Sequence, residues 1–306
     1  MYKTSKFLST FVKIAISLWA VYYLMQHFEK QHISIEIVRR LSLLQILILF
    51  LLSLVNWSVE IRKWQYLASN VKQIDFFEAS RQSLISFALS LLTPNRVGEL
   101  GIKTLFFDKR DAKKIFSLSL IGTTTQMLNS LLFGFAGLLI LLIFDPNILA
   151  DFASKINIHL STSQQILTGL VILLFIGFII FVIKQRKKKL LLNSLSIWIK
   201  TFGFSFIRYL VFSFQFLLIY SIFSSESNLF LIYIAIALTY LLATIIPMLA
   251  FMDWAVKGSV ALSVFGFLHL QSDIAVVSVA LMWLLNFLLP FVAGIYLLWQ
   301  WKKVRD

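Results

Sequence analysis

Long uncharged apolar runs dominate this chain and restrict the folds open to it. Apolar residues make up 59% of its 306 residues, and the mean hydropathy is +0.86. A water-soluble globule of this composition would expose too much hydrocarbon to remain in solution. The runs are also too long for the core helices of soluble folds, and the strands of a membrane barrel would instead alternate polar and apolar residues. The sequence therefore predicts an all-α polytopic membrane protein.

Six apolar runs are long enough to cross a bilayer as helices. They cover Phe7 to Met25, Leu43 to Val59, Ile115 to Phe144, Ile166 to Ile183, Phe202 to Phe223 and Ile274 to Trp299. Short basic loops tend to stay in the cytoplasm, and the strongest one here is residues 184–189. Basic residues also precede the first run and follow the last, so both termini are expected on the cytoplasmic side of the cell membrane.

Two polar stretches are predicted to lie at the membrane surface. Glu60, Lys63 and Trp64 follow the second run as part of a charged and aromatic interface belt. A short segment with Trp198 and Lys200, before the fifth run, is expected to rest on the cytoplasmic interface.

One unusual pattern occurs twice, 153 residues apart. A proline closes an apolar run, an acid follows, and a lysine comes four residues after the acid. The pattern consists of Pro94, Glu99 and Lys103 in the first half and of Pro247, Asp253 and Lys257 in the second. Fixed charges are expensive in apolar surroundings and tend to mark function there. The repetition favours two related units that face a shared centre.

The residues around the first pattern are too few to cross a bilayer. The 14 residues between Arg81 and Arg96 would cover about 21 Å as a helix, against a hydrocarbon core of about 30 Å. Both flanks are basic, which predicts a re-entrant helical hairpin with its tip at Thr93, Pro94 and Asn95. A second hairpin is expected between Leu229 and Leu268, although its first arm is long enough to span by itself, so a spanning arm stays open there.

Each half of the chain then consists of two spans, a hairpin and a further span. The first half starts inside the cell and the second starts outside. The predicted architecture is a single transmembrane domain, residues 1–306, made of two inverted-topology repeats, residues 1–153 and 154–306. It contains about six spanning helices and two re-entrant hairpins.

The first hairpin carries a family resemblance. The segment Pro94-Asn95-Arg96-Val97-Gly98-Glu99, followed by a short apolar arm and a basic loop, resembles the transmembrane, or flippase, region of bacterial lysylphosphatidylglycerol synthases and of related stand-alone flippase-like proteins. The likeness covers most of the chain in hydropathy, and only this motif is specific in residues. In that family the second hairpin usually has a glycine-rich turn and then a glutamate. Here Pro247 precedes five residues without glycine and then Asp253.

The resemblance implies movement of a polar-headed phospholipid or related lipid, anionic or zwitterionic, between the leaflets of a bacterial cell membrane. It also makes a second copy of the chain, or a lipid-synthesising enzyme, a candidate partner. The synthases carry a soluble aminoacyl-transfer domain after the membrane part, whereas this chain ends at Asp306. Enzymatic transfer of an amino acid to lipid is therefore not expected.

The residue chemistry points in the same direction. A phosphate headgroup needs cations and N–H donors, and Arg96 offers a planar fork that suits phosphate oxygens. Helix starts after Pro94 and Pro247 would add free N–H groups to the hairpin tips, where Asn95 and Gly98 also lie.

The repeated acids Glu99 and Asp253 have two possible interpretations. Glu99 and Asp253 are predicted to bind an ammonium-bearing headgroup or to take up a coupling proton, with Lys103 and Lys257 holding them ionised. The plainer reading is that each acid and lysine only neutralise each other on a buried helix. Repetition after a proline in both halves favours the functional reading.

Other polar residues are weaker candidates. Arg208 lies about six residues into its predicted helix, where snorkelling to the cytoplasmic face is favoured over substrate binding. Interhelical hydrogen bonding explains polar residues inside predicted spans, among them Asn56, Gln126, Gln215 and Asn286. The four histidines lack ligand spacing, so no metal or other cofactor is predicted. Basic clusters beside helix ends suit membrane topology better than nucleic acid.

The best-supported function from sequence is a lipid translocase with a polar cavity at midmembrane. An ion or small-solute channel or transporter is the first alternative, with the same charges lining a pore. A non-transporting membrane partner of a lipid-modifying enzyme is the second. A translocase needs a side opening through which acyl chains stay in the bilayer, whereas a channel needs a continuous water path.

Overall fold

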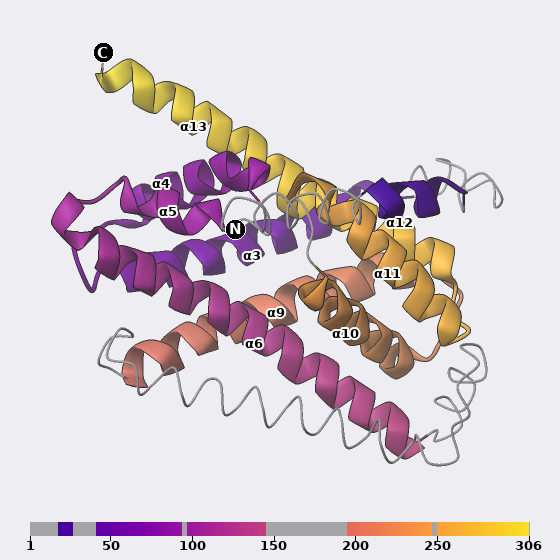
Figure 1. Ribbon diagram of the computed structural model, residues 1–306. Coiled ribbons are helices and arrows are strands. Elements are labelled where there is room, and N and C mark those ends of the chain that lie inside the picture. Colours follow the sequence, from indigo (N-terminus) through magenta and orange to yellow (C-terminus); the bar gives the residue numbers. More distant parts are fainter. Residues whose placement is uncertain (1–17, 27–40, 94–96, 145–194, 247–249, 306) are drawn as a thin grey trace, which may run out of the picture.

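The computed structural model describes residues 18–26, 41–93, 97–144, 195–246 and 250–305. Every secondary-structure element within these ranges is helical (Figure 1), in agreement with the predicted all-α membrane fold. Several predicted features lie outside the described residues: most of the first span, the fourth span, and the tip residues Pro94, Asn95, Arg96 and Pro247.

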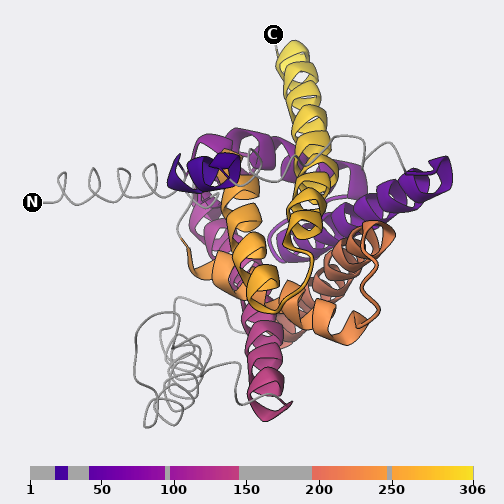
Figure 2. The ribbon, with the colours of Figure 1, turned by 90° about the vertical axis from the view of Figure 1, so that its right-hand side faces the viewer.

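Within the described ranges, four helical stretches are long and apolar enough to cross a membrane. Their elements are α3 (Leu43–Ala68), η2 (Lys109–Asp111) with α6 (Ala112–Phe144), α9 (Leu195–Phe223), and α12 (Ser272–Trp283) with the π-helical turn η4 (Leu284–Leu288) and α13 (Leu289–Arg305). These stretches contain four of the six predicted spans. The C-terminal part of α13 projects from the rest of the molecule in both ribbon views (Figures 1 and 2).

Two of these helices are longer than predicted. Helix α3 continues beyond Val59 to Ala68, and helix α9 begins at Leu195 instead of near Phe202. The predicted interfacial segments are therefore parts of long helices, and Trp198 lies in the first turn of α9. No glycine or proline interrupts either extension, so the helical hydrogen bonds propagate through the charged residues.

Two shorter helix pairs occupy the positions of the predicted hairpins. The first consists of α4 (Phe76–Leu89), η1 (Ser90–Leu92) and α5 (Gly98–Thr104), and the second of α10 (Leu229–Ile245), η3 (Ala250–Met252) and α11 (Asp253–Phe267). Helix α4 packs against α5, and α10 packs against α11. The short helices η1 and η3 contact each other, so the ends of the two pairs meet inside the molecule.

Thr93 closes the end of the first pair. Its Oγ1 accepts a hydrogen bond from the Gly98 N–H at 3.0 Å and donates one to the Ser90 carbonyl at 2.6 Å. A Cβ atom at Gly98 would overlap the Thr93 side chain. Glycine at this position therefore allows the start of α5 to lie directly against Thr93.

The two halves pack against each other across glycines. Helix α6 packs on α10, where Gly134 abuts Ala237 and Leu241, and α13 packs on α4, where Gly294 abuts Leu84 and Ala88. The two partner pairs, 84 with 88 and 237 with 241, are 153 positions apart in the sequence. Helices α3 and α9 pack against each other, and α5 on α6 is matched by α11 on α12. Each such contact thus has a counterpart with the halves exchanged.

Candidate functional site

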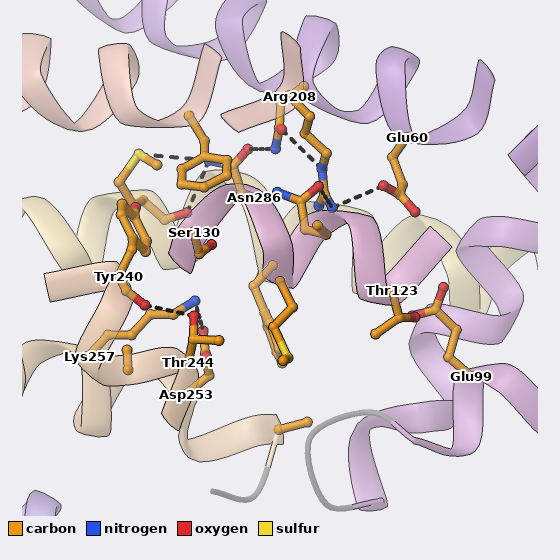
Figure 3. Close-up of a pocket in the computed structure, with 18 of the residues that line it drawn as sticks. Glu60, Glu99, Thr123, Ser130, Arg208, Tyr240, Thr244, Asp253, Lys257 and Asn286 are labelled. Carbon is orange, nitrogen blue, oxygen red and sulfur yellow. Dashed lines mark hydrogen bonds and ion pairs between the residues drawn. The ribbon is translucent and has the colours of Figure 1, made fainter. Parts of the chain in front are cut away.

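A cavity of about 410 Å³ lies between the four long stretches and the two helix pairs (Figure 3). Its lining comes from α3, α5, α6, α9, α10, η3, α11, α12 and η4. Five residues singled out from sequence line it together: Glu99, Lys103, Arg208, Asp253 and Lys257. The structure therefore brings the repeated acid and lysine positions of both halves to one site.

The repeated pairs have the same geometry. Lys103 Nζ lies 2.8 Å from Glu99 Oε1, and Lys257 Nζ lies 2.8 Å from Asp253 Oδ2. Each pair joins neighbouring turns of one helix, as the four-residue spacing requires. Figure 3 shows Glu99 and Asp253 on opposite sides of the cavity. The site therefore presents one acid and one lysine from each half.

An aromatic ring supports each of these lysines. Lys103 Nζ lies 4.4 Å from the centroid of the Trp64 ring in α3, and Lys257 Nζ lies 5.8 Å from that of Tyr240 in α10. Both distances fall within the range of cation–π attraction. Each ammonium group is thus held between a carboxylate and an aromatic face, which fixes its position in the lining.

A further ion-pair cluster, which sequence reasoning missed, completes the charged lining. Glu60 Oε2 lies 2.7 Å from Lys63 Nζ and 2.9 Å from Arg208 Nη1. Lys63 is only 3% exposed and lies within α3, which continues to Ala68, so the prediction that the helix ends before these charges is wrong. A signal was present, because residues 56, 60, 63 and 67 recur at helical spacing on one face of α3.

Arg208 lines the cavity and has its partners on α3 and α6. It lies near the middle of α9, and its side chain is 18% exposed. Its Nε donates to Asn56 Oδ1 at 3.2 Å, and its Nη1 contacts Gln126 Oε1 at 3.5 Å. Asn56 and Gln126 also lie near the middle of their own long helices. This polar cluster is therefore far from both ends of the membrane-crossing stretches.

Asn286 connects the cluster to α12 and α13. Its Oδ1 accepts from Asn56 Nδ2 at 2.7 Å, and its Nδ2 donates to Gln215 Oε1 at 2.9 Å. These bonds agree with the interhelical role expected for Asn56, Gln215 and Asn286.

Asn286 belongs to the π-helical turn η4, and Pro290 follows four residues later. Because proline has no N–H, the Asn286 carbonyl lacks its ordinary helical donor. Trp57 Nε1 from α3 replaces that donor at 3.1 Å. Single π turns of this kind often occur at functional sites.

The described lining carries a net positive charge. It contains the four cations Lys63, Lys103, Arg208 and Lys257 and the three carboxylates Glu60, Glu99 and Asp253, which gives +1. In the described ranges, no group of three or more His, Asp or Glu residues lies in an arrangement able to hold a metal ion. The arrangement suits a polar ligand with an anionic group, bound by hydrogen bonds and ion pairs.

Of the predicted hairpin-tip residues, the structure describes Thr93 and Gly98. Pro94, Asn95, Arg96 and Pro247 lie outside the described residues, while Gly98 begins α5 directly before Glu99.

Comparisons with protein-family models, with curated proteins and with solved structures found no match. The resemblance to the flippase region of the synthases therefore remains a prediction from the sequence.

Proposed function

We propose that the protein is a flippase-like lipid translocase that moves a polar-headed phospholipid, or a related anionic or zwitterionic lipid, between leaflets. One observation carries this proposal. Two helix pairs, one from each half of the chain, bring matching acid and lysine positions to a single charged cavity between four membrane-crossing stretches. Charged residues within membrane-crossing segments are costly and tend to mark a functional site.

The size of the cavity supports a headgroup as ligand. Its volume of about 410 Å³ is at the lower end of the range of about 300–1,000 Å³ that is typical of small-molecule sites. This space suits a lipid headgroup but not two long acyl chains. In the proposed mechanism the headgroup therefore crosses through the cavity while the chains remain in the bilayer.

The ion pairs allow the cavity to exist without substrate. Each lysine in the lining has a carboxylate partner within 2.8 Å. A headgroup phosphate would compete for the cations, and a headgroup ammonium would compete for Glu99 and Asp253. Arg96, at the tip of the first hairpin, remains a further phosphate ligand in this proposal, on the strength of its sequence position.

The matched packing of the two halves supports alternating access. Inverted repeats of residues 1–153 and 154–306 would permit one half to rock against the other around a shared site. The exchanged contacts of α6 with α10 and of α13 with α4 fit such a relation. In this proposal both helix pairs are re-entrant hairpins, both termini are cytoplasmic, and the protein acts without enzymatic chemistry, as a homo-oligomer or beside a lipid-synthesising enzyme.

The test is leaflet exchange in liposomes. Purified protein is reconstituted with phospholipids that carry a fluorophore on an acyl chain or the headgroup, and a membrane-impermeant quencher measures how much label reaches the outer leaflet. We expect leaflet exchange with wild-type protein. The double variant that combines Glu99→Gln and Asp253→Asn should exchange lipid at least about tenfold more slowly, because the charge-assisted contacts of both carboxylates with the headgroup are lost. Lys113→Gln, at an exposed position, is the control.

Other outcomes would favour the alternatives. Flux of ions or small solutes without any lipid exchange would indicate a channel or solute transporter. Absence of both activities in well-folded protein would contradict transport and favour a non-transporting partner of a lipid-modifying enzyme. Solute flux is measured in the same liposomes with an entrapped dye, so the two activities are compared in one preparation.

A further inference from the structure

Among the described residues, the cations that line the cavity outnumber its carboxylates, so they do not all have a carboxylate partner of their own. Three lysines each have a carboxylate of their own within one turn of the same helix: Lys63 with Glu60, Lys103 with Glu99, and Lys257 with Asp253. Arg208 has no such partner on α9, and it shares Glu60 Oε2 with Lys63. Arg208 is therefore the surplus cation in the described part of the lining.

The guanidinium of Arg208 has donors to spare. Nε donates to Asn56, and Nη1 contacts Glu60 and Gln126. Nη2 makes no hydrogen bond to any described residue, and Arg208 lines the cavity. Because a guanidinium presents five N–H donors in a rigid plane, a ligand in the cavity can still be bound through this edge.

We propose that Arg208 anchors the anionic phosphate group of the ligand and that Glu60 is the resident counter-ion that the phosphate displaces. When Arg208 turns to the phosphate, Glu60 keeps Lys63, so no carboxylate loses its last partner. The same change at Lys103 would strand Glu99. A stranded buried charge is strongly destabilising, so anion binding is least costly at Arg208.

This inference rests on the proposed translocase function and defines its substrate. A lining with a net charge of +1 favours a headgroup with net negative charge over a zwitterionic one. A phosphodiester of the phosphatidylglycerol type has that charge. Free inorganic phosphate shares the anionic chemistry, so the experiment compares both sources.

The first experiment measures binding by thermal unfolding of the purified protein in detergent. The probes are dioctanoyl phosphatidylglycerol, dioctanoyl phosphatidylcholine and inorganic phosphate. We expect phosphatidylglycerol to bind wild-type protein at least about tenfold more tightly than phosphatidylcholine, and Arg208→Gln to remove this preference. The variant should keep its Tm without lipid, because every remaining lysine retains its carboxylate.

Lys113→Gln is the matched control, since it removes one positive charge at an exposed position outside the cavity. It should keep the wild-type preference. Equal binding of phosphatidylglycerol by wild type and Arg208→Gln would overturn the anchor. A Tm shift from inorganic phosphate as large as that from phosphatidylglycerol would overturn the lipid as the source of the phosphate.

The second experiment tests the displaced counter-ion. Glu60→Gln with Lys63→Gln removes the competing carboxylate, strands no lysine and leaves the net charge of the lining unchanged. Phosphatidylglycerol should bind this double variant several-fold more tightly than wild type, because Arg208 no longer has to leave a carboxylate. Weaker binding than wild type would overturn the exchange.

Leaflet exchange, measured on the same variants, separates the two proposals. Wild-type protein that binds phosphatidylglycerol through Arg208 without moving it between leaflets would contradict the translocase and support the anchor. Exchange that is equally fast for Arg208→Gln and wild type, with unchanged headgroup preference, would support the translocase and overturn the anchor.

Discussion

At the scale of single residues, local ion pairs lower the free-energy cost of burying charged side chains around the cavity. Lys103 has a side chain only 7% exposed, and Glu99 provides the compensating charge one turn earlier on α5. A buried charge without a partner would lose far more solvation than a surface charge. The pair therefore has a structural role even when it also binds substrate, and a test must separate the two.

Glu99→Gln should lower both stability and leaflet exchange. The substitution leaves the Lys103 ammonium without its carboxylate, which costs about 1–3 kcal/mol of unfolding free energy. Glu99→Gln with Lys103→Met should regain stability, since methionine still packs on Trp64, while exchange stays low. Thermal unfolding and liposome exchange are measured side by side. Recovery of exchange in the double variant would reduce the pair to a structural role.

At the scale of elements, glycine contacts set how closely the two halves pack. Gly294 in α13 faces the backbone of α4, and Gly134 in α6 faces α10. Small residues at crossing points let helix backbones approach closely, which is a main source of helix association in membranes. These two crossings hold the helix pair of each half against a long helix of the other half.

Gly294→Ala should destabilise the protein by about 1–3 kcal/mol, because the new Cβ atom would overlap the Leu84 carbonyl and push α13 away from α4. Gly203→Ala in α9 is the matched control. A Cβ atom there meets nothing within 4 Å beyond the neighbouring backbone of its own helix, so the substitution should leave stability unchanged or raise it slightly. Denaturation of both variants in the same detergent makes the comparison, and equal losses would contradict the close crossing.

The π turn η4 is a second element with a testable role. Pro290→Ala restores an N–H that competes with Trp57 for the Asn286 carbonyl. We expect unchanged or higher thermal stability but slower leaflet exchange, because a regular helix would turn the Asn286 side chain away from Asn56. Trp57→Phe, which removes the other donor, should instead lower stability by about 1 kcal/mol. Wild-type exchange by Pro290→Ala would show that the π turn is unimportant for transport.

At the scale of the whole molecule, the proposed topology makes a prediction about sidedness. Lys72 and Lys109 flank the first helix pair and are exposed, and a re-entrant hairpin would place both in the cytoplasm. The chain has no cysteine, so single cysteines at these positions can be labelled without background. Both should react with an impermeant maleimide from the cytoplasmic side only. A cysteine at Ser227, in the exposed connector before α10, should react only from the opposite side.

Labelling of positions 72 and 109 from opposite sides would end the hairpin proposal for the first pair. The four long stretches would still cross the membrane by length and composition. The first pair would then count as one broken span, and the two halves would no longer have opposite topology. The proposal of inverted repeats would then be wrong as well, whereas the ion pairs of the cavity would be unaffected.

Sequence reasoning reached the helical class, four of the membrane-crossing stretches and the repeated acid and lysine pairs. It ended α3 too early, because the charges at Glu60 and Lys63 resembled a membrane interface. Charge alone does not end a helix. The partner of Glu60 across the cavity is Arg208, which lies 148 positions later in the sequence, so the sequence did not indicate that these charges face the inside of the protein. The π turn could not be predicted either. Pro290 is visible in the sequence, but the donor to the Asn286 carbonyl is Trp57, which comes from a helix distant in sequence.

The order of synthesis gives the local ion pairs a further consequence. At about 5–20 residues per second, Asp253 is made roughly 8–30 s after Glu99, so the two sides of the cavity cannot meet for that time. Lys103 and Lys63 follow Glu99 and Glu60 by four and three residues and are made within about a second of them. Each acid is thus neutralised while the nascent chain still lacks its second half. Arg208 joins Glu60 later, and Asn286 of η4, which binds Asn56, is made after both, so the ribosome must pass residue 286 before the polar cluster of the site is complete.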